Sequence, residues 1–482
     1  MILCPRNDTC TANMYPARPY CRYFSPMRHL SSFSRLLPVL GLSVLLLPGC
    51  YSRSDMKSED SAAKETPAAV PPEEAPGAVP AKPQAADAET AGATVQPLKA
   101  VNVFLEVSGS MEGFMPKTGA SGENTKFQQH VAQFLSEVNR TGAARQKMFY
   151  RIKEKPYRDS YQGISTTVRS GIQQPAKSTD IPSVLDTLMT NYYQPGTVSV
   201  LISDFIYSPK NTGAIPYIKT DITDALSRSG SHPELAVSVY GYTSDFRGTY
   251  YPALVASGKK TNCCDTEIPY YIWVVGPADA VRQFDKALLE QQPAKQAHFG
   301  VTYPQPNYSL LNKYQNKGSW YYGDAGASKR NAETYRVISV SEASAKQPIE
   351  FVVGLDLSGL PGQYRDVAYL KQNMKLQGVD TDAKLLDVSA ATAQTKASSG
   401  PESKFTHFAK MRLTQQPKAA RPLVLRLQDQ RPAWVAQWTT RNDATPAPKT
   451  FALSSLLDGL EAQGGEERKP IFELPLTLQP AE

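Results

Sequence analysis

Three short segments of the sequence carry oxygen-bearing side chains beside apolar or helical patterns. "VFLEVSGSMEGF" has the carboxylate Glu106 and the hydroxyls Ser108 and Ser110 at alternate positions where an apolar run ends. "KSTDIPSVLDTL" has Thr179 just before a helical pattern, and "LISDFIYSP" has Asp204 at the end of a second apolar run. Carboxylate and hydroxyl oxygens are the ligands that hard divalent cations such as Mg²⁺ prefer. If the fold brings these segments together, they predict a metal site.

The elements around these segments alternate between strands and helices. Apolar runs typical of buried strands occupy residues 100–107, 197–205, 234–242 and 268–276. Apolar residues at helical spacing fall between these runs, for example Phe127, Val131, Phe134, Leu135 and Val138. Alternation of this kind predicts an α/β fold with a doubly wound, mostly parallel sheet. In such sheets ligands bind at the carboxyl ends of the strands, where Glu106 and Asp204 lie.

The order and placement of these residues resemble the von Willebrand factor A (VWA) domain and its metal-ion-dependent adhesion site. The resemblance covers residues 99–292. Its most specific parts are the loop that carries Ser108 and Ser110, called the serine loop below, and the segment "VLISD". It implies that Glu106, Ser108, Ser110, Thr179 and Asp204 hold Mg²⁺, or another divalent cation such as Mn²⁺ or Ca²⁺. It also implies an open coordination position that an acidic group of a partner completes. The family has Asp where this chain has Glu106, which is one methylene longer and could either reach the ion directly or crowd it out.

Each of these residues also has a purely structural interpretation. Ser108 and Ser110 can cap turns through local hydrogen bonds, and Thr179 can cap the helix that follows it. Glu112 is near the serines and is expected to be solvated. If these residues have only structural roles, the chain keeps a VWA shape and serves as a metal-free interaction platform.

The sequence contains no recognisable catalytic set. The five histidines have no spacing suited to zinc, and neither a Gly-x-Ser-x-Gly elbow, a P-loop nor a dinucleotide-binding glycine pattern occurs. We therefore expect a binding or scaffold protein rather than an enzyme. The alternative is a metal-dependent hydrolase of the cell envelope, which needs a base beyond the metal ligands.

The N-terminal region predicts export and lipid anchoring. Residues 1–50 end in a basic segment, an apolar run and "LPGC", which is typical of an export signal and resembles a bacterial lipobox with Cys50 as the acylated residue. The true start is then Met27. An Ala- and Pro-rich stretch, 51–98, predicts a disordered tether. A plain secretory signal is the alternative for residues 1–50. Tyr51 after Cys50 favours the outer membrane if the host has two.

Charge and cysteine content limit the partners and the disulfides that we expect. The formal net charge is +7, but removing residues 1–50, with five Arg and one Asp, leaves 47 basic against 44 acidic residues, a net +3. No basic stripe with interleaved aromatic residues occurs, so a nucleic-acid partner is not expected. Beyond Cys50 only the adjacent Cys263 and Cys264 remain. They can form a vicinal disulfide, stay as thiols or bridge to another chain.

The last part of the chain has a different pattern. Strict alternation of apolar residues at 349–357, 423–427 and 472–478 predicts half-buried antiparallel strands. One helical segment, 449–462, interrupts them. Residues 300–482 are therefore expected to form a β-rich C-terminal domain. Taken together, we expect a membrane-anchored extracytoplasmic protein that recognises an acidic ligand or a protein partner through a divalent metal.

Overall fold

The computed structural model shows a mixed α/β fold and separate, largely antiparallel sheets. It describes residues 96–481 apart from 118–122, 178, 208–211, 229, 231, 233, 254–260, 264–265, 324–333, 379–380 and 464–467. The proposed signal, Cys50 and most of the predicted tether lie outside the described residues.

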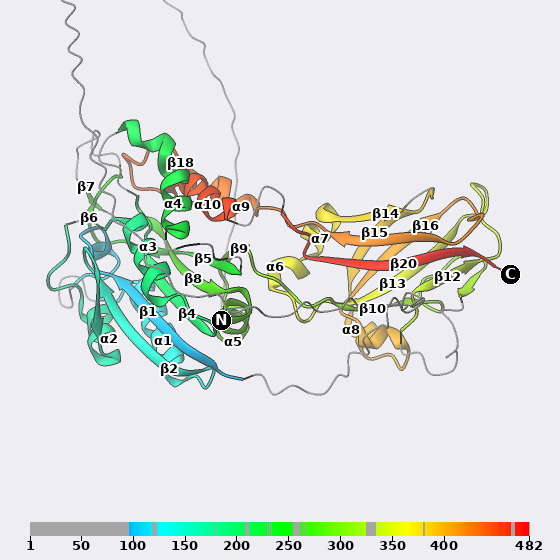
Figure 1. Ribbon diagram of the computed structural model, residues 1–482, viewed down its shortest axis with the longest axis horizontal. Helices are drawn as coiled ribbons and strands as arrows, with labels where there is room; N and C mark the ends of the chain where they lie inside the picture. The colour runs from blue at the N-terminus through cyan, green and yellow to red at the C-terminus, as the bar shows by residue number, and fades with distance from the viewer. Residues whose placement is uncertain are drawn as a thin grey trace, which may run out of the picture. The chain divides into compact units, whose positions relative to one another are not determined.

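A seven-stranded sheet forms the centre of the α/β part, in the order β3-β2-β1-β4-β8-β5-β9 (Figure 1). Its strands are β1 (Leu98–Glu106), β2 (Ala144–Ile152), β3 (Pro156–Asp159), β4 (Thr197–Ser203), β5 (Leu235–Asp245), β8 (Glu267–Pro277) and β9 (Lys295–Phe299). A short hairpin, β6 (Gly248–Tyr250) and β7 (Thr261–Cys263), stands between β5 and β8. All four apolar runs predicted as strands are confirmed.

The sheet contains both parallel and antiparallel pairs. β1 pairs in parallel with β2 and β4, whereas β8 is antiparallel to both β4 and β5, and β9 is antiparallel to β5. The prediction of a mostly parallel sheet therefore holds for β2, β1 and β4, whereas the strand predicted at 268–276 is antiparallel to both of its neighbours. The described part of the connection from β5 to β8 forms a hairpin and contains no helix that would carry the chain back to the other end of the sheet. The amino end of β8 consequently lies at the same sheet edge as the carboxyl ends of β1 and β4.

Helices cover both faces of the sheet. Alternate residues of β1 divide between two cores, with Val103 and Leu105 in one and Phe104 in the other. The first core includes α1 (Lys126–Arg140), α2 (Tyr161–Ser170) and α5 (Ala278–Leu288). The second includes α3 (Ile181–Tyr192), α4 (Ile218–Ser227), α9 (Ala433–Gln437) and α10 (Leu453–Ala462). Short 3₁₀ segments, η1 (Ser110–Gly113) and η2 (Thr212–Tyr217), follow β1 and precede α4.

The predicted β-rich region forms two sheets that share one apolar core. One sheet contains β10 (Asn307–Leu311), β13 (Ile349–Asp356), β16 (His407–Leu413) and β15 (Lys384–Ala390). The other contains β11 (Trp320–Tyr322), β12 (Val337–Val340), β20 (Phe472–Pro480), β17 (Arg421–Leu427) and β14 (Met374–Gly378). Every pair is antiparallel except β12 with β20. Short helical segments connect these strands: α6 (Gly362–Arg365), α7 (Val367–Asn373), α8 (Ala393–Lys396) and η4 (Pro401–Lys404).

A segment near the C-terminus belongs to the α/β core rather than to the β-sandwich. Between β17 and β20 the chain forms α9, β18 (Thr439–Thr440), β19 (Thr450–Phe451) and α10. Apolar residues of α10 such as Leu457 share a core with α4, and the two helices pack closely because Gly459 has no side chain. The sequence pattern identifies the helix but gives no indication of which core it joins.

A buried polar cluster lies between β5, α5 and β9. The Ser238 hydroxyl donates a hydrogen bond to Asp285 Oδ2 (2.5 Å) and lies 2.8 Å from His298 Nδ1. Burial raises the pKa of Asp285 to about 7 and lowers the pKa of His298 to about 3. A protonated carboxyl beside a neutral imidazole therefore avoids two unpaired charges in the core.

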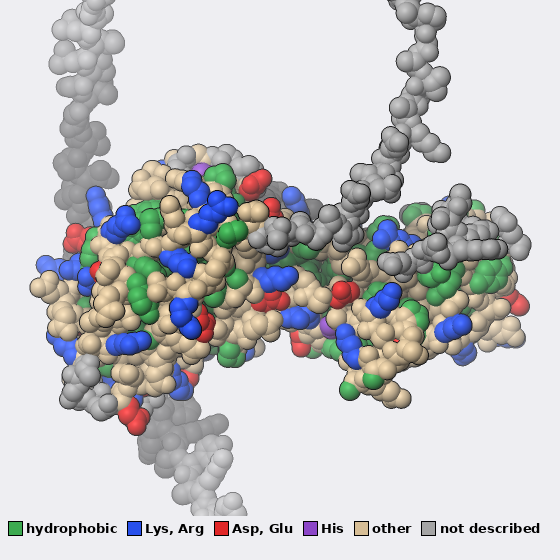
Figure 2. All heavy atoms as spheres, turned by 90° about the horizontal axis from the view of Figure 1, so that it is seen from below, with side chains coloured by type: hydrophobic (Ala, Val, Ile, Leu, Met, Phe, Trp, Pro, Cys, Tyr) green, Lys and Arg blue, Asp and Glu red, His purple; other side chains and the backbone are tan. Residues whose placement is uncertain are grey.

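Figure 2 shows the distribution of charge on one face of the described surface. On this face, basic side chains are scattered among neutral ones rather than gathered in a stripe. In the part of the chain that the structure describes, no helix has both the length and the apolar character needed to span a bilayer.

The close contact at Gly459 predicts the effect of adding one methyl group. A Cβ at this position would lie 2.6 Å from the Cβ of Ile222 and 2.9 Å from the carbonyl oxygen of Lys219. We expect Gly459→Ala to lower the free energy of unfolding by about 1–3 kcal/mol, measured by urea denaturation. Gly142→Ala is the control, because a Cβ there would have nothing within 4 Å. A Gly459→Ala protein as stable as the wild type would contradict the close packing of α10 against α4.

The raised pKa of Asp285 predicts a pH-dependent stability. Between about pH 4 and pH 7 the folded state keeps a proton that the unfolded state has lost, so this carboxyl lowers stability as the pH rises through that window. Asp285→Asn cannot titrate. Its free energy of unfolding relative to the wild type should therefore increase by on the order of 2–4 kcal/mol from pH 4 to pH 7, and stay constant above pH 7. Asp224→Asn, at an exposed carboxylate, is the control. A difference in the free energy of unfolding between Asp285→Asn and the wild type that does not change with pH would refute the raised pKa of Asp285.

Candidate metal centre

β1 and β4 terminate at the same end of the sheet and place two carboxylates there. The two strands are parallel neighbours, and Leu105 of β1 pairs with Ile202 of β4. Glu106 and Asp204 follow these paired residues and are both buried, with 3% and 2% of their surface exposed. Two of the predicted ligands therefore lie close together in the core, as the strand pattern predicts.

A serine that the sequence analysis did not single out holds Glu106. The Ser203 hydroxyl donates a hydrogen bond to Glu106 Oε2 and accepts one from the backbone N–H of Phe205 at 2.8 Å. Phe205 has a φ of 51°, which is uncommon for a residue with a side chain. The chain thus turns sharply just after Asp204, and the Ser203 hydroxyl supports both the turn and the carboxylate. Nothing in the sequence distinguishes Ser203 from other small polar residues of buried strands.

The serine loop contacts Asp204 from the β1 side. The hydroxyl oxygens of Ser108 and Ser110 are 3.0 Å apart, and the Ser110 hydroxyl lies near the Asp204 carboxylate, where it acts to lower the pKa of Asp204 against the larger effect of burial. Asp204 Oδ1 accepts the backbone N–H of Ile206 at 3.0 Å. Asp204 Oδ2 is buried and has no hydrogen-bond partner among the described residues. Four of the five predicted ligands therefore meet, and one carboxylate oxygen remains without a partner.

The electrostatics of this site favour an added positive charge. Burial, and secondarily the negative charge of Glu106, raise the pKa of Asp204 to about 7. No ion pair found among the described residues includes either carboxylate. Two buried carboxylates without a cationic side chain must be compensated by a proton or by a bound cation. The donor set, with two carboxylates and neutral hydroxyls, fits a hard divalent cation.

Thr179 lies near this edge, but no described contact joins its side chain to the other four residues. Its segment is tied to the serine loop through backbone hydrogen bonds, from Ala176 N–H to Val107 O (2.9 Å) and from Gly109 N–H to Ala176 O (3.0 Å). The Thr179 hydroxyl itself donates to the carbonyl of Lys153 over a long 3.5 Å. The N-cap of α3 is Asp180, so the interpretation of Thr179 as the helix cap is wrong.

Residues that the sequence analysis missed lie above the site. Tyr250 of β6 is buried, and the negative charges of Asp443 and Asp204 add to burial in raising its pKa. Asp443 is itself buried and accepts the backbone N–H of Ala253 at 2.6 Å. Asp443 follows β18, more than 200 residues after Asp204, so no local sequence signal connects the two. The C-terminal segment therefore contributes a carboxylate near the predicted site.

The cysteines singled out in the sequence lie largely outside the described part of the chain. Cys50 and Cys264 are not among the described residues, and Cys263 is placed only as the last residue of β7. Among the described residues, no group of three or more His, Cys, Asp or Glu side chains could hold a metal ion. The predicted site differs from such a group, since it combines two carboxylates with hydroxyls.

Comparisons with known proteins do not assign this chain to a family. No protein family, no curated protein and no solved structure matches it. Its function is therefore inferred from the geometry of the site and from the sequence patterns.

The role of Ser203 gives a prediction for stability. Ser203→Ala removes a hydroxyl and leaves a buried Glu106 oxygen and the Phe205 N–H without this partner. We expect a loss of about 1–3 kcal/mol in the free energy of unfolding. Ser199→Ala, on the same buried strand, is the control, because its hydroxyl makes no hydrogen bond that is found among the described residues. Equal losses in the two variants, measured by chemical denaturation, would show that Ser203 has no special role.

Proposed function

We propose that this protein is a lipid-anchored, extracytoplasmic binding or scaffold protein that recognises an acidic ligand or protein partner through a divalent cation. The observation that carries the proposal is the pair of buried carboxylates, Glu106 and Asp204, on neighbouring parallel strands. They lie beside the Ser108 and Ser110 hydroxyls, and no ion pair among the described residues includes them. This arrangement supports the VWA resemblance drawn from the sequence.

Both neutral and charged oxygen donors of this chain would hold the cation. Ser108 and Ser110 would offer neutral oxygens, while Glu106 and Asp204 would offer charge, and Thr179 is the fifth donor that the sequence resemblance implies. A cation held there supplies a positive centre with room for a carboxylate from a partner. Where the carboxylates hold the ion through water molecules, the direct donors are the uncharged hydroxyls, so the ion keeps positive character and attracts an anionic partner.

Membrane attachment is the second element of the proposal. It rests on the sequence of residues 27–50, which resembles an export signal ending in a lipobox with Cys50 as the lipid-bearing residue. The Ala- and Pro-rich residues 51–98 would then hold the binding site away from the membrane surface. The outer membrane is favoured where the host has two.

A metal-free interaction platform is the second candidate function. It is favoured by the hydrogen bond from Ser203 to Glu106 and by the pKa of Asp204 near 7, because a proton on Asp204 can then replace the cation. In that case binding would depend on the surface of the loops and not on an ion.

Partner capture distinguishes these two candidates. Immobilised full-length protein is incubated with a cell-envelope extract in Mg²⁺ or in EDTA, and the captured proteins are quantified by mass spectrometry. We expect EDTA, Ser110→Ala and Asp204→Ala each to reduce capture of the same partner at least about tenfold, because each removes the cation or one of its donors.

Asp224→Ala is the matched control, since Asp224 is an exposed carboxylate on α4 away from the serine loop. It should capture as the wild type does, and circular dichroism confirms that all variants are folded. Capture that withstands EDTA and both site substitutions would exclude the metal bridge and favour the metal-free platform.

A further inference from the structure

One edge of the central sheet is left open beside a cavity of about 510 Å³. β9 pairs with β5 only from Val237 to Gly241, although β5 continues to Asp245. In this register Pro293 would stand opposite Thr243, and a proline has no N–H with which to continue the ladder. No described strand pairs with residues 242–245 on that side. Such an edge presents unpaired backbone groups to any extended chain that reaches it.

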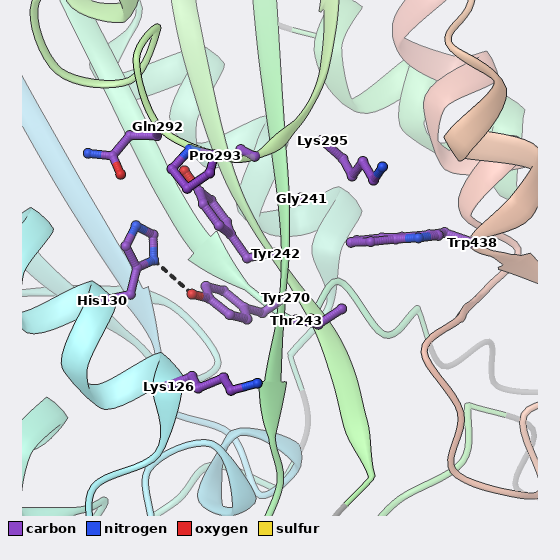
Figure 3. Close-up of a pocket in the computed structure, with 11 residues that line it drawn as sticks. Lys126, His130, Gly241, Tyr242, Thr243, Tyr270, Gln292, Pro293, Lys295 and Trp438 are labelled. Carbon is purple, nitrogen blue, oxygen red and sulfur yellow. Dashed lines mark hydrogen bonds between the residues drawn. The ribbon is translucent and has the colours of Figure 1, made fainter.

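The cavity extends around this edge and touches both faces of the sheet. On one face lie Tyr242, Tyr270 and His130, where the His130 Nδ1 atom is 2.7 Å from the Tyr270 hydroxyl. On the other face the Trp438 ring lies over Gly241, where a Cβ would be only 3.1 Å from it. Figure 3 shows these two groups of side chains on opposite sides of the strand, with Lys295 on the Trp438 side.

The lining leaves polar groups without partners and carries positive charge. The Tyr242 hydroxyl and His130 Nε2 are buried and have no hydrogen-bond partner among the described residues. The charged residues of the lining are Lys126 and Lys295, and no carboxylate of the described chain lines the cavity. Lys126 is paired with Glu267 at the rim, so the exposed Lys295 is the main cation available to a ligand. These groups favour an anionic ligand that also makes hydrogen bonds.

We propose that the open edge of β5 binds an acidic segment of a partner protein in extended conformation, as an added β-strand. A strand is the shape that fits, because its successive side chains point to opposite faces of the sheet. One side chain would then contact Trp438 and Lys295, and the next would contact Tyr242 and His130. The backbone would pair with the part of β5 beyond β9 that lines the cavity, Tyr242 and Thr243, because Ser244 is fully buried. This site is separate from the proposed metal centre and does not depend on it.

The test uses the full-length protein and a fluorescein-labelled peptide with the sequence Asp-Val-Asp-Phe-Asp-Val. Binding is followed by fluorescence anisotropy. We expect saturable binding that weakens at least about tenfold in Lys295→Glu, which reverses an exposed charge, and in Trp438→Ala, which removes the aromatic contact. Lys384→Glu, the same charge reversal at an exposed position of β15, is the matched control and should bind as the wild type does.

Backbone pairing is tested by changing the backbone of the peptide and leaving the protein unchanged. Two peptides that are N-methylated at alternate residues, in complementary registers, lose different sets of N–H donors while keeping every side chain. An added strand predicts that at least one of them binds at least about tenfold more weakly. Equal binding by both and by the parent peptide would overturn the proposal.

Two further readouts distinguish this site from the metal centre and from a dimer interface. EDTA and Asp204→Ala should leave peptide binding unchanged, so failure of the metal centre and failure of this site are distinguishable. No saturable peptide binding would overturn the proposal. So would a concentration-dependent dimer, found by analytical ultracentrifugation, that is lost in Lys295→Glu while no peptide binds, because a second copy of the chain would then occupy the edge.

Discussion

The desolvation of two neighbouring carboxylates is the constraint on which the rest of this site depends. Glu106 and Asp204 leave adjacent parallel strands in the middle of the sheet, where water is excluded and their charges repel each other. Burying one unpaired carboxylate already costs several kcal/mol. The protein offsets this cost only in part, through hydrogen bonds from the Ser203 hydroxyl and the Ile206 N–H and through the nearby Ser110 hydroxyl. The compensation that the described residues do not supply is a positive charge.

The fold maintains this costly arrangement through contacts that are distant in sequence. The pairing of β1 with β4 fixes the two carboxylates side by side, and the backbone bridge to Ala176 holds the serine loop in place. The segment with Asp443 follows most of the sandwich strands in the chain, yet it packs in the α/β core and binds the backbone N–H of Ala253 there. A second polar cluster, around Asp285, solves the same problem differently, because it holds one carboxyl beside a neutral histidine. The carboxylate pair where β1 and β4 end has hydroxyl and amide partners but contacts no histidine among the described residues.

The features that the sequence predicts are those with a local signal. The apolar runs locate the strands, and a polar residue at the end of a buried strand identifies Glu106, Ser110 and Asp204 before their contacts are known. The antiparallel direction of β8 has no such signal, since apolar composition does not distinguish a parallel from an antiparallel strand. The contributions of Ser203 and Asp443, and the open edge of β5, arise from strand register and from the return of the C-terminal segment. Such features depend on pairing between distant residues and have no local pattern.

The central claim, that the carboxylates and the serine loop hold a divalent cation, is tested most directly by titrating the metal-free protein with Mn²⁺ at pH 8 and following free Mn²⁺ by electron paramagnetic resonance. The account predicts one saturable site that Mg²⁺ displaces and that is lost in Asp204→Ala but retained in Asp224→Ala. A wild-type protein that binds no Mn²⁺ at this site, or an Asp204→Ala protein that binds it equally well, would contradict the account.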